Sequence, residues 1–383
     1  MSIQLSSVGL AAAALFTAAL VALISTPVVR SLAFRVGAVD VPKDGRRMHD
    51  HPIPRMGGLA IFFGFILSVL IFLPLTSELQ GMLLGGVVIV ILGILDDIYS
   101  LPALPKFFTQ IGAALIAVLH GNRIEFLSNP NIFSSEPFWE LGWLAVPITV
   151  FWIVGITNAV NLIDGLDGLA CGVSTISSMT LLVIALIVLE PDAALLMGAL
   201  SGACIGFLPY NLNPAKIFMG DTGSTFLGFI LAVVSIQGLF KFYAIISFAV
   251  PFLMLGLPIF DTCFAILRRV SHGQSPMSPD RGHIHHRLID MGFSQKQAVA
   301  VLYIISAILG LSAVVLTTIG VVRAMLFLLA LCAAGAVAGK LYLDHSNGTS
   351  PPVSSGEVRV AKPRRSQPAD IENFFGEEDR SDK

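Results

Sequence analysis

Two amides and two carboxylates recur at every third residue in the stretch NAVNLIDGLDG, which covers residues 158–168. They are Asn158, Asn161, Asp164 and Asp167. Side chains at three-residue steps lie along one side of a helix or a tight turn. Apolar runs flank the stretch, and carboxylates without basic neighbours are costly in such a setting. We therefore favour a functional stripe over a plain polar loop that joins two helices.

Two further acidic motifs carry the residue types of a magnesium site. Asp96 and Asp97 end an apolar run, where they meet the negative end of a helix dipole and each other. A divalent metal or a basic contact would relieve this repulsion. The motif FMGDTGS at residues 218–224 opens another apolar run. It is either an ordinary helix cap or a phosphate-binding helix start at which Asp221 holds Mg²⁺.

The polar stretch SPDRGHIHHR at residues 278–287 gathers three histidines and two arginines. Its candidate binding residues are Arg281, His283, His285 and His286. A tetrahedral zinc site is one interpretation of the histidines. Their spacing and the two arginines make a cationic cluster, which favours an anion such as a diphosphate or a nucleotide over a metal.

Two single charged residues have less specific contexts. Lys106 opens an apolar run, where its ammonium either reaches the membrane surface or contacts an anionic headgroup. Asp261 lies within another apolar run, and it either pairs with Arg268 or lines a cavity. We favour the buried pair for Asp261.

The composition predicts an all-α, polytopic membrane protein. Of the 383 residues, 55% are apolar and 13% are charged, and the mean hydropathy is +0.82. Soluble domains carry about 25% charged residues, whereas many runs here approach the roughly 20 residues that cross a bilayer. The four cysteines lie far apart, which argues against a disulfide or metal role. The net charge of −2 argues neither for nor against nucleic acid, and we expect no such partner.

Hydropathy predicts about eleven membrane spans within one multi-span domain, residues 1–343. They are expected near residues 8–29, 57–75, 80–95, 105–120, 144–160, 170–189, 193–210, 222–238, 243–267, 298–317 and 320–342. A short hairpin is compatible with the loop at residues 121–143. The polar, Pro- and Ser-containing tail at residues 344–383 is expected to be a disordered cytosolic segment.

The basic residues predict an N-terminus outside and a C-terminus inside the cell. With that orientation only Arg123, Lys241 and Arg323 of the 23 Lys and Arg residues lie outside. The acidic residues at span ends, including the three motifs above, then all lie at the cytosolic face. A cation-coupled transporter, the rival interpretation, would also place polar groups at mid-membrane or on the far side. The one-sided chemistry suits transfer from a cytosolic phosphorylated donor to a membrane-embedded acceptor.

Four motifs together resemble the polyprenyl-phosphate N-acetylhexosamine-1-phosphate transferases of glycosyltransferase family 4. They are the Asp96–Asp97 pair, NAVNLIDGLDG, FMGDTGS and HIHH, and the resemblance runs from about Val39 to Ala300. The HIHHR form is similar to the bacterial undecaprenyl-phosphate N-acetylglucosamine-1-phosphate transferases of teichoic acid and O-antigen assembly. It is less similar to the sister enzymes that use UDP-N-acetylmuramoyl-pentapeptide.

The resemblance implies a reaction in the plasma membrane. Undecaprenyl phosphate would attack the β-phosphate of UDP-N-acetylglucosamine and release UMP, as the first membrane step of a cell-envelope glycopolymer. Mg²⁺, which Mn²⁺ can replace, would neutralise the diphosphate. A homodimer is compatible with the resemblance. A sister donor such as UDP-N-acetylmuramoyl-pentapeptide stays open as an alternative.

The resemblance also implies roles for the candidate residues. Asp221 and Asn161 would hold the metal, and Asp96 and Asp97 would orient or deprotonate the lipid phosphate. Lys106 would contact that phosphate. The remaining residues would bind the donor, with the nucleotide pocket formed by Asn158, Asp164 and Asp167 and the diphosphate or sugar held by Arg281, His283, His285 and His286.

Overall fold

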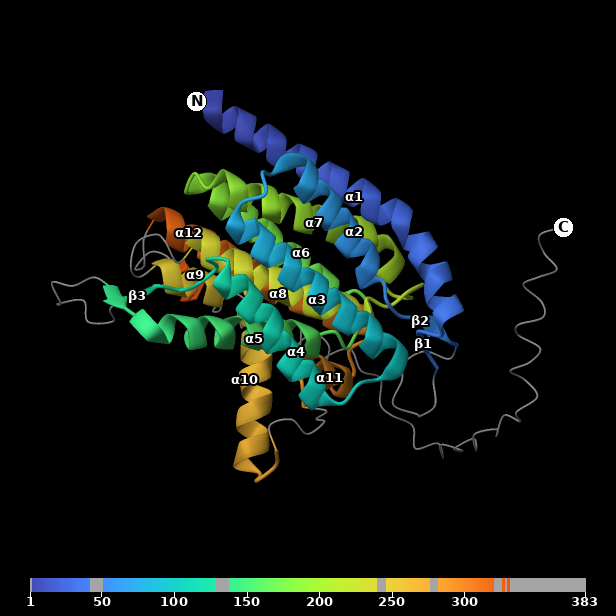
Figure 1. The fold of residues 1–383 in the computed structure, drawn as a ribbon. Coiled ribbons are helices and arrows are strands. Elements are labelled where there is room, and N and C mark those ends of the chain that lie inside the picture. The colour runs from blue at the N-terminus through green and yellow to red at the C-terminus, as the bar shows by residue number, and fades with distance from the viewer. Residues whose placement is uncertain are drawn as a thin grey trace, which may run out of the picture. The chain divides into compact units, whose positions relative to one another are not determined.

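The computed structural model describes residues 2–41, 51–128, 138–239, 246–275 and 282–319, together with 326, 327, 329 and 330. These residues form a bundle of helices (Figure 1). The helices are α1 (Ser2–Val36), α2 (Gly58–Phe72), α3 (Ser77–Tyr99), α4 (Ala103–Leu119), α5 (Ala145–Leu162), α6 (Leu169–Ile187), α7 (Pro191–Asn211), α8 (Gly220–Leu239), α9 (Ile246–Met254), α10 (Gly256–Ser271), α11 (Ile284–Asp290) and α12 (Gln295–Ile319).

Two short antiparallel strand pairs accompany the helices. Strand β1 (Val39–Asp40) pairs with β2 (Ile53–Pro54), directly before α2. Strand β3 (Phe126–Ser128) pairs with β4 (Phe138–Glu140), and a 3-10 turn at Gly142–Leu144 leads from them into α5. The second pair confirms the hairpin expected within residues 121–143.

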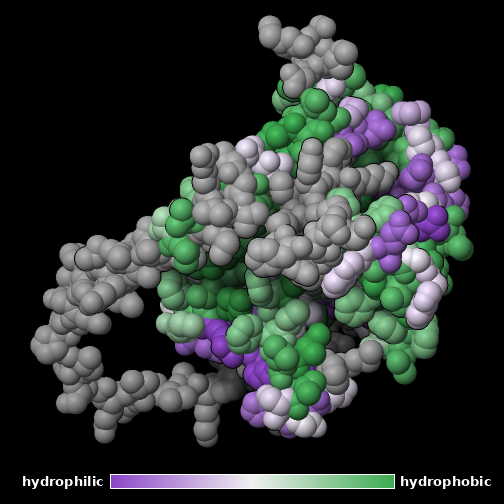
Figure 2. Space-filling model, turned by 90° about the vertical axis from the view of Figure 1, so that its left-hand side faces the viewer, coloured by the Kyte–Doolittle hydropathy of each residue, from purple (hydrophilic) through white to green (hydrophobic). Residues whose placement is uncertain are grey.

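The fold confirms an all-α, multi-pass membrane protein. Within the described ranges, six helices are long and apolar enough to cross a membrane, and α2 and α4 are shorter apolar helices. Large apolar side chains such as Phe16 and Phe151 are exposed, as lipid-facing positions allow. The described residues on the face drawn in Figure 2 are largely apolar, and the hydrophilic ones gather towards the upper right and the lower edge.

One predicted span is not a single helix. The apolar run expected to cross the membrane at residues 243–267 forms two helices, because the chain departs from helical geometry at Leu255 between α9 and α10. Helix α10 projects from the bundle in Figure 1. The span expected at 320–342 lies outside the described residues, apart from four helical positions between 326 and 330. The tail at 344–383 also lies outside them.

Helix α8 forms the centre of the bundle. It packs against α2, α3, α5, α6, α7 and α9. Beyond its polar first turns its side chains are mostly apolar, and Phe226, Phe229 and Ile230 are fully buried. Glycines allow the neighbouring backbones to approach: a Cβ atom on Gly93 of α3 would lie 2.3 Å from the Cα of Thr222. The first turn of α8 therefore lies directly against the polar end of α3.

A row of small residues joins α1 to α7. Gly198, Gly202 and Gly206 recur at four-residue steps on α7, and each faces a backbone carbonyl of α1. A Cβ atom on Gly202 would lie 2.1 Å from the carbonyl oxygen of Leu15. Such small residues let membrane helices pack at close range, where dispersion forces and backbone contacts hold them together.

Candidate functional site

The start of α8 is fixed by an acid from α3. The two carboxylate oxygens of Asp97 accept the backbone N–H groups of Asp221 and Thr222 at 3.0 and 3.1 Å, and the Thr222 hydroxyl at 2.6 Å. Asp97 is only 5% exposed. Asp97 on α3 thus accepts hydrogen bonds from N–H groups in the first turn of α8 that have no partner within α8 itself. The dipole of α8 also favours a negative charge at this end of the helix. Gly220, with a φ of 70°, leaves room for this carboxylate.

Lys106 lies between two carboxylates. Its Nζ atom is 2.9 Å from Oδ2 of Asp96 and 2.9 Å from Oδ2 of Asp221. The other oxygen of Asp96 accepts the N–H of Leu101 at 2.7 Å, in the turn from α3 to α4. The consecutive helices α3 and α4 and the distant α8 therefore bring their polar side chains to one place.

The amides of α5 reach the same place. Asn161 donates to the Ser224 hydroxyl at 2.8 Å and also hydrogen-bonds Asp221. One turn earlier, Asn158 donates to Oε1 of Gln110 on α4 at 2.6 Å. The close crossing of α5 and α8, made by Gly228, brings Asn161 to the start of α8, whereas Asn158 lies against α4.

The loop between α5 and α6 separates its two carboxylates into different environments. Burial, and then the negative charges of Asp221 and Asp97, raise the pKa of Asp164 to about 8. Asp164 therefore belongs to the same acidic region. Asp167 instead accepts Asn213 Nδ2 at 2.9 Å and the N–H of Ala215 at 3.0 Å. It holds the connection that leads from α7 to α8.

Asp261 positions the histidine motif. Its carboxylate accepts the N–H of Ile284 at 2.8 Å, and its other oxygen lies 2.8 Å from Nδ1 of His283. The predicted pair of Asp261 with Arg268 is wrong, because the Arg268 guanidinium donates to the carbonyl of Gly282 at 2.8 Å. Asp261 thus connects α10 to the first turn of α11.

His285 packs against the loop that carries Asp164. A Cβ atom on Gly165 would lie 2.3 Å from Nε2 of His285, so this imidazole rests on the loop backbone. Burial, and then the positive charge of a protonated His286, lower the pKa of His285 to about 4. The imidazole is therefore neutral at neutral pH, and the predicted cationic character of the cluster does not include it. The predicted Arg281 lies outside the described residues.

Some residues of the site carry no clear sequence signal. Gln110 and Asn213 are ordinary polar residues that acquire partners only in the fold. Tyr303 on α12 donates its hydroxyl to the carbonyl of Gly168 at 2.6 Å and so fixes the end of the α5–α6 loop. A tyrosine in an apolar helix could have been singled out, because its hydroxyl needs a partner when buried.

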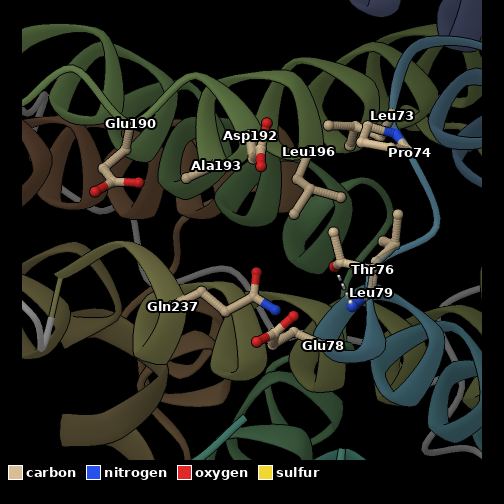
Figure 3. Close-up of a pocket in the computed structure, with 10 residues that line it drawn as sticks. All are labelled: Leu73, Pro74, Thr76, Glu78, Leu79, Glu190, Asp192, Ala193, Leu196 and Gln237. Atoms are coloured by element: carbon tan, nitrogen blue, oxygen red, sulfur yellow. Dashed lines mark hydrogen bonds between the residues drawn. The ribbon is translucent and has the colours of Figure 1, made fainter. Parts of the chain in front are cut away.

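A separate pocket lies at the other end of α8. It has a volume of about 220 Å³ and contains Gln237 together with the acids Glu78, Glu190 and Asp192 (Figure 3). None of the predicted site residues lines it. An acidic cluster alone does not identify a ligand, and we assign this pocket no role.

The donor set at the start of α8 fits magnesium better than zinc. Among the described residues, no three His, Cys, Asp or Glu side chains group as a metal site. Zinc needs such a closed set, whereas Mg²⁺ needs one or two carboxylates and completes its shell with water and substrate phosphates. Asp221 and Asn161 offer oxygens of this kind. The ammonium of Lys106 already provides a positive charge at this position.

Comparison with known proteins identifies the family. The model of the family "Glycosyl transferase family 4" matches residues 79–239. The chain is also 48% identical over 302 residues to the Bacillus subtilis (strain 168) "Probable undecaprenyl-phosphate N-acetylglucosaminyl 1-phosphate transferase", covering 78% of this chain and 82% of that protein. The chain belongs to glycosyl transferase family 4.

Other relatives differ in their named substrates. The "Decaprenyl-phosphate N-acetylglucosaminephosphotransferase" of Mycolicibacterium smegmatis is 35% identical over 75% of this chain and 77% of its own length. The "Phospho-N-acetylmuramoyl-pentapeptide-transferase" of Listeria welshimeri is 36% identical, but over only 50% of this chain and 64% of its own length. The resemblance found in the sequence motifs is thereby confirmed at the level of the family.

Proposed function

We propose that the protein transfers N-acetylglucosamine-1-phosphate from UDP-N-acetylglucosamine to undecaprenyl phosphate and releases UMP. The reaction named for the Bacillus subtilis relative supports this assignment. The observation that carries it is the position of Asp221, which lies at a helix start among Lys106 and Asn161. A helix N-terminus favours phosphate, and a nearby carboxylate and amide can hold the cation that accompanies a diphosphate.

Asp221 and Asn161 would hold Mg²⁺, or Mn²⁺ in its place. The bound ion would neutralise negative charge as two phosphorylated substrates approach each other. We assign different roles to the neighbouring residues Asp96 and Asp97. Asp97 positions the start of α8 through its three hydrogen bonds, and Asp96 orients the acceptor phosphate together with Lys106. Because that phosphate has a second pKa of roughly 6, it needs positioning more than deprotonation.

The donor would lie between the α5–α6 loop and α11. His283, His285 and His286 would contact its diphosphate or sugar, and Arg281 would join them. The neutral imidazole of His285 would then bind as a hydrogen-bond partner rather than as a cation. Asn158, Asp164 and Asp167 would shape the nucleotide pocket, with Asp167 acting through the connection that it holds.

We further propose about eleven spans, counting the interrupted run of α9 and α10 as one, with the N-terminus outside and the site at the cytosolic face, on the strength of the positive-inside rule. A cytosolic donor requires that face. A fluorescent-protein fusion that folds only in the cytosol should then be fluorescent at the C-terminus and dark at the N-terminus, and the reverse pattern would contradict this orientation. The homodimer, the 1–343 transferase boundary and the role in teichoic acid or O-antigen assembly stay predictions.

The reaction is tested with purified protein, labelled UDP-N-acetylglucosamine, undecaprenyl phosphate and Mg²⁺. We expect UMP and a lipid-linked sugar diphosphate, and loss of both products after chelation of the metal. The similarity to the Listeria welshimeri enzyme makes UDP-N-acetylmuramoyl-pentapeptide the relevant competitor. Preferential use of that donor would select the sister reaction. No product from any UDP-amino sugar would contradict the assignment, and uptake of a cation into proteoliposomes would favour a transporter.

A further inference from the structure

One ammonium group contacts two carboxylates that come from different helices. The Nζ atom of Lys106 lies 2.9 Å from both Asp96 and Asp221, and the three side chains are 26, 10 and 27% exposed. Two ionised carboxylates that share one ammonium are close enough to repel each other when that positive charge is removed. The position is therefore one that requires positive charge, and in this structure Lys106 supplies it.

The carboxylates are fixed more firmly than the ammonium. Asp96 is held by the N–H of Leu101, and the backbone of Asp221 is held by Asp97. Lys106 has only its two ion pairs and a flexible four-carbon stem. If the charge between the acids is replaced, the lysine is the member of the group that can move.

We propose that Lys106 is an exchangeable counter-ion of the metal site. In the metal-free protein it holds Asp96 and Asp221 together, and it leaves Asp221 when a divalent cation binds there. Its ammonium then becomes available to the phosphate of the lipid acceptor. This inference rests on the proposed function, since it assumes that Asp221 binds the metal of the transfer reaction.

Exchange of this kind couples the metal to the acceptor. While Lys106 occupies Asp221, the metal must compete with an ammonium and the acceptor lacks a free cation. Displacement of Lys106 removes both obstacles together. By thermodynamic reciprocity, an acceptor phosphate that captures Lys106 must strengthen metal binding by the same factor. A permanent ion pair, the alternative, would leave the environment of Lys106 unchanged when metal binds.

The first test follows Lys106 in the wild-type protein, so that no variant needs to fold. The substrate-free protein is treated briefly with an amine-acylating reagent, with and without saturating Mn²⁺, and modified lysines are quantified by mass spectrometry. Lys216 is the matched control, because it is exposed and lies on the α7–α8 connection. We expect acylation of Lys106 to rise severalfold with Mn²⁺ while that of Lys216 stays constant. Equal acylation of Lys106 in both conditions would overturn the exchange.

The second test measures free Mn²⁺ by electron paramagnetic resonance during titration of the substrate-free protein. Lys106→Met removes the competing ammonium, so the Kd for Mn²⁺ should fall by about tenfold or more. A change of this size corresponds to the loss of one strong charge interaction. Lys106→Arg and Lys216→Met should bind Mn²⁺ as the wild type does. Equal or weaker binding by Lys106→Met would contradict competition.

The two proposals fail in different ways. If the wild type is active and needs Mg²⁺ but neither measurement responds at Lys106, the exchange is wrong and the transferase assignment stands. If the protein transfers no sugar phosphate and Mn²⁺ binds neither the wild type nor Lys106→Met, the proposed function fails and the exchange fails with it.

Discussion

Asp97 accepts the hydroxyl of Thr222 at 2.6 Å, across the contact between α3 and α8. The same carboxylate takes the first free N–H groups of α8. Asp97 thus fixes the backbone position of Asp221 in the first turn of α8. Its neighbour Asp96 faces Lys106 instead, so two adjacent carboxylates have different partners.

Replacement of Asp97 should therefore destabilise the protein as well as inactivate it. Asp97→Ala leaves two buried N–H groups and a hydroxyl without their acceptor, at a cost on the order of 3 kcal/mol. We expect a clearly lower melting temperature in detergent together with loss of transfer. Thr222→Val, which removes only the hydroxyl, should have a smaller effect of about 1 kcal/mol. An Asp97→Ala protein that melts like the wild type would show that α8 does not depend on this carboxylate.

The glycine row on α7 predicts a stability effect far from the chemistry. Gly202→Ala places a Cβ atom 2.1 Å from the carbonyl oxygen of Leu15, so α1 and α7 must move apart. We expect a lower melting temperature. Gly155→Ala is the matched control, because a Cβ atom there meets no other atom within 4 Å. That control should be neutral or slightly stabilising, since alanine is the better helix former. Equal melting of both variants would argue against close packing of α1 on α7.

The contact of Gly165 with His285 predicts a substrate-binding effect. Gly165→Ala would push the imidazole away from the α5–α6 loop, because the added Cβ atom lies 2.3 Å from Nε2. We expect the KM for UDP-N-acetylglucosamine to rise about tenfold or more while the KM for the lipid changes little. Gly112→Ala, at an open position on α4, should leave both KM values near those of the wild type. An unchanged donor KM in Gly165→Ala would separate His285 from donor binding.

Burial of neutral His285 predicts a loss of stability in acid. The groups that face it are His283 directly before α11, His286 on α11, Asp261 on α10 and the loop that carries Asp164. The pKa of His285 is about 4 in the fold and 6.5 in its ordinary state. The unfolded chain therefore binds a proton that the folded chain does not as pH falls from about 6.5 towards 4. The free energy of unfolding should decrease in this window, by about 2 kcal/mol at pH 5.

The pH effect is measured as the change in melting temperature between pH 7.5 and pH 5. His285→Gln removes the proton-binding group and should lose less stability over this interval than the wild type. His272→Gln changes an exposed histidine and should lose as much as the wild type. If His285→Gln and the wild type lose the same amount, the imidazole is not held neutral by its surroundings.

The sequence predicts the polar residues of the site well because charged and amide side chains are rare in apolar runs. Asp97, Asn161 and Asp221 stand out for that reason, and the structure brings them together around the start of α8. The sequence does not reveal their partners. Whether Asp167 faces a ligand or holds Asn213 depends on the path of the α7–α8 connection, and that path has no motif.

The sequence likewise predicts the positions of most helices but not how they are interrupted or paired. Apolar runs locate most helices, because membrane helices need continuous apolar surface. Hydropathy cannot locate the break at Leu255, because apolar residues continue from α9 across Leu255 into the first turn of α10. Hydropathy also cannot predict tertiary pairs such as Asp261 with His283, because these pairs depend on the direction in which α10 leaves the bundle.

The account depends most on Asp221, and one comparison tests it directly. UMP release from UDP-N-acetylglucosamine and undecaprenyl phosphate is measured for the wild type and for Asp221→Ala at saturating Mg²⁺, with the melting temperature of each protein. Because Asp97 holds the backbone of α8 and not the Asp221 side chain, the variant should fold. We predict a rate lower by on the order of 10³-fold at a nearly unchanged melting temperature. Turnover within a few-fold of the wild type would contradict a magnesium-bearing site at the start of α8.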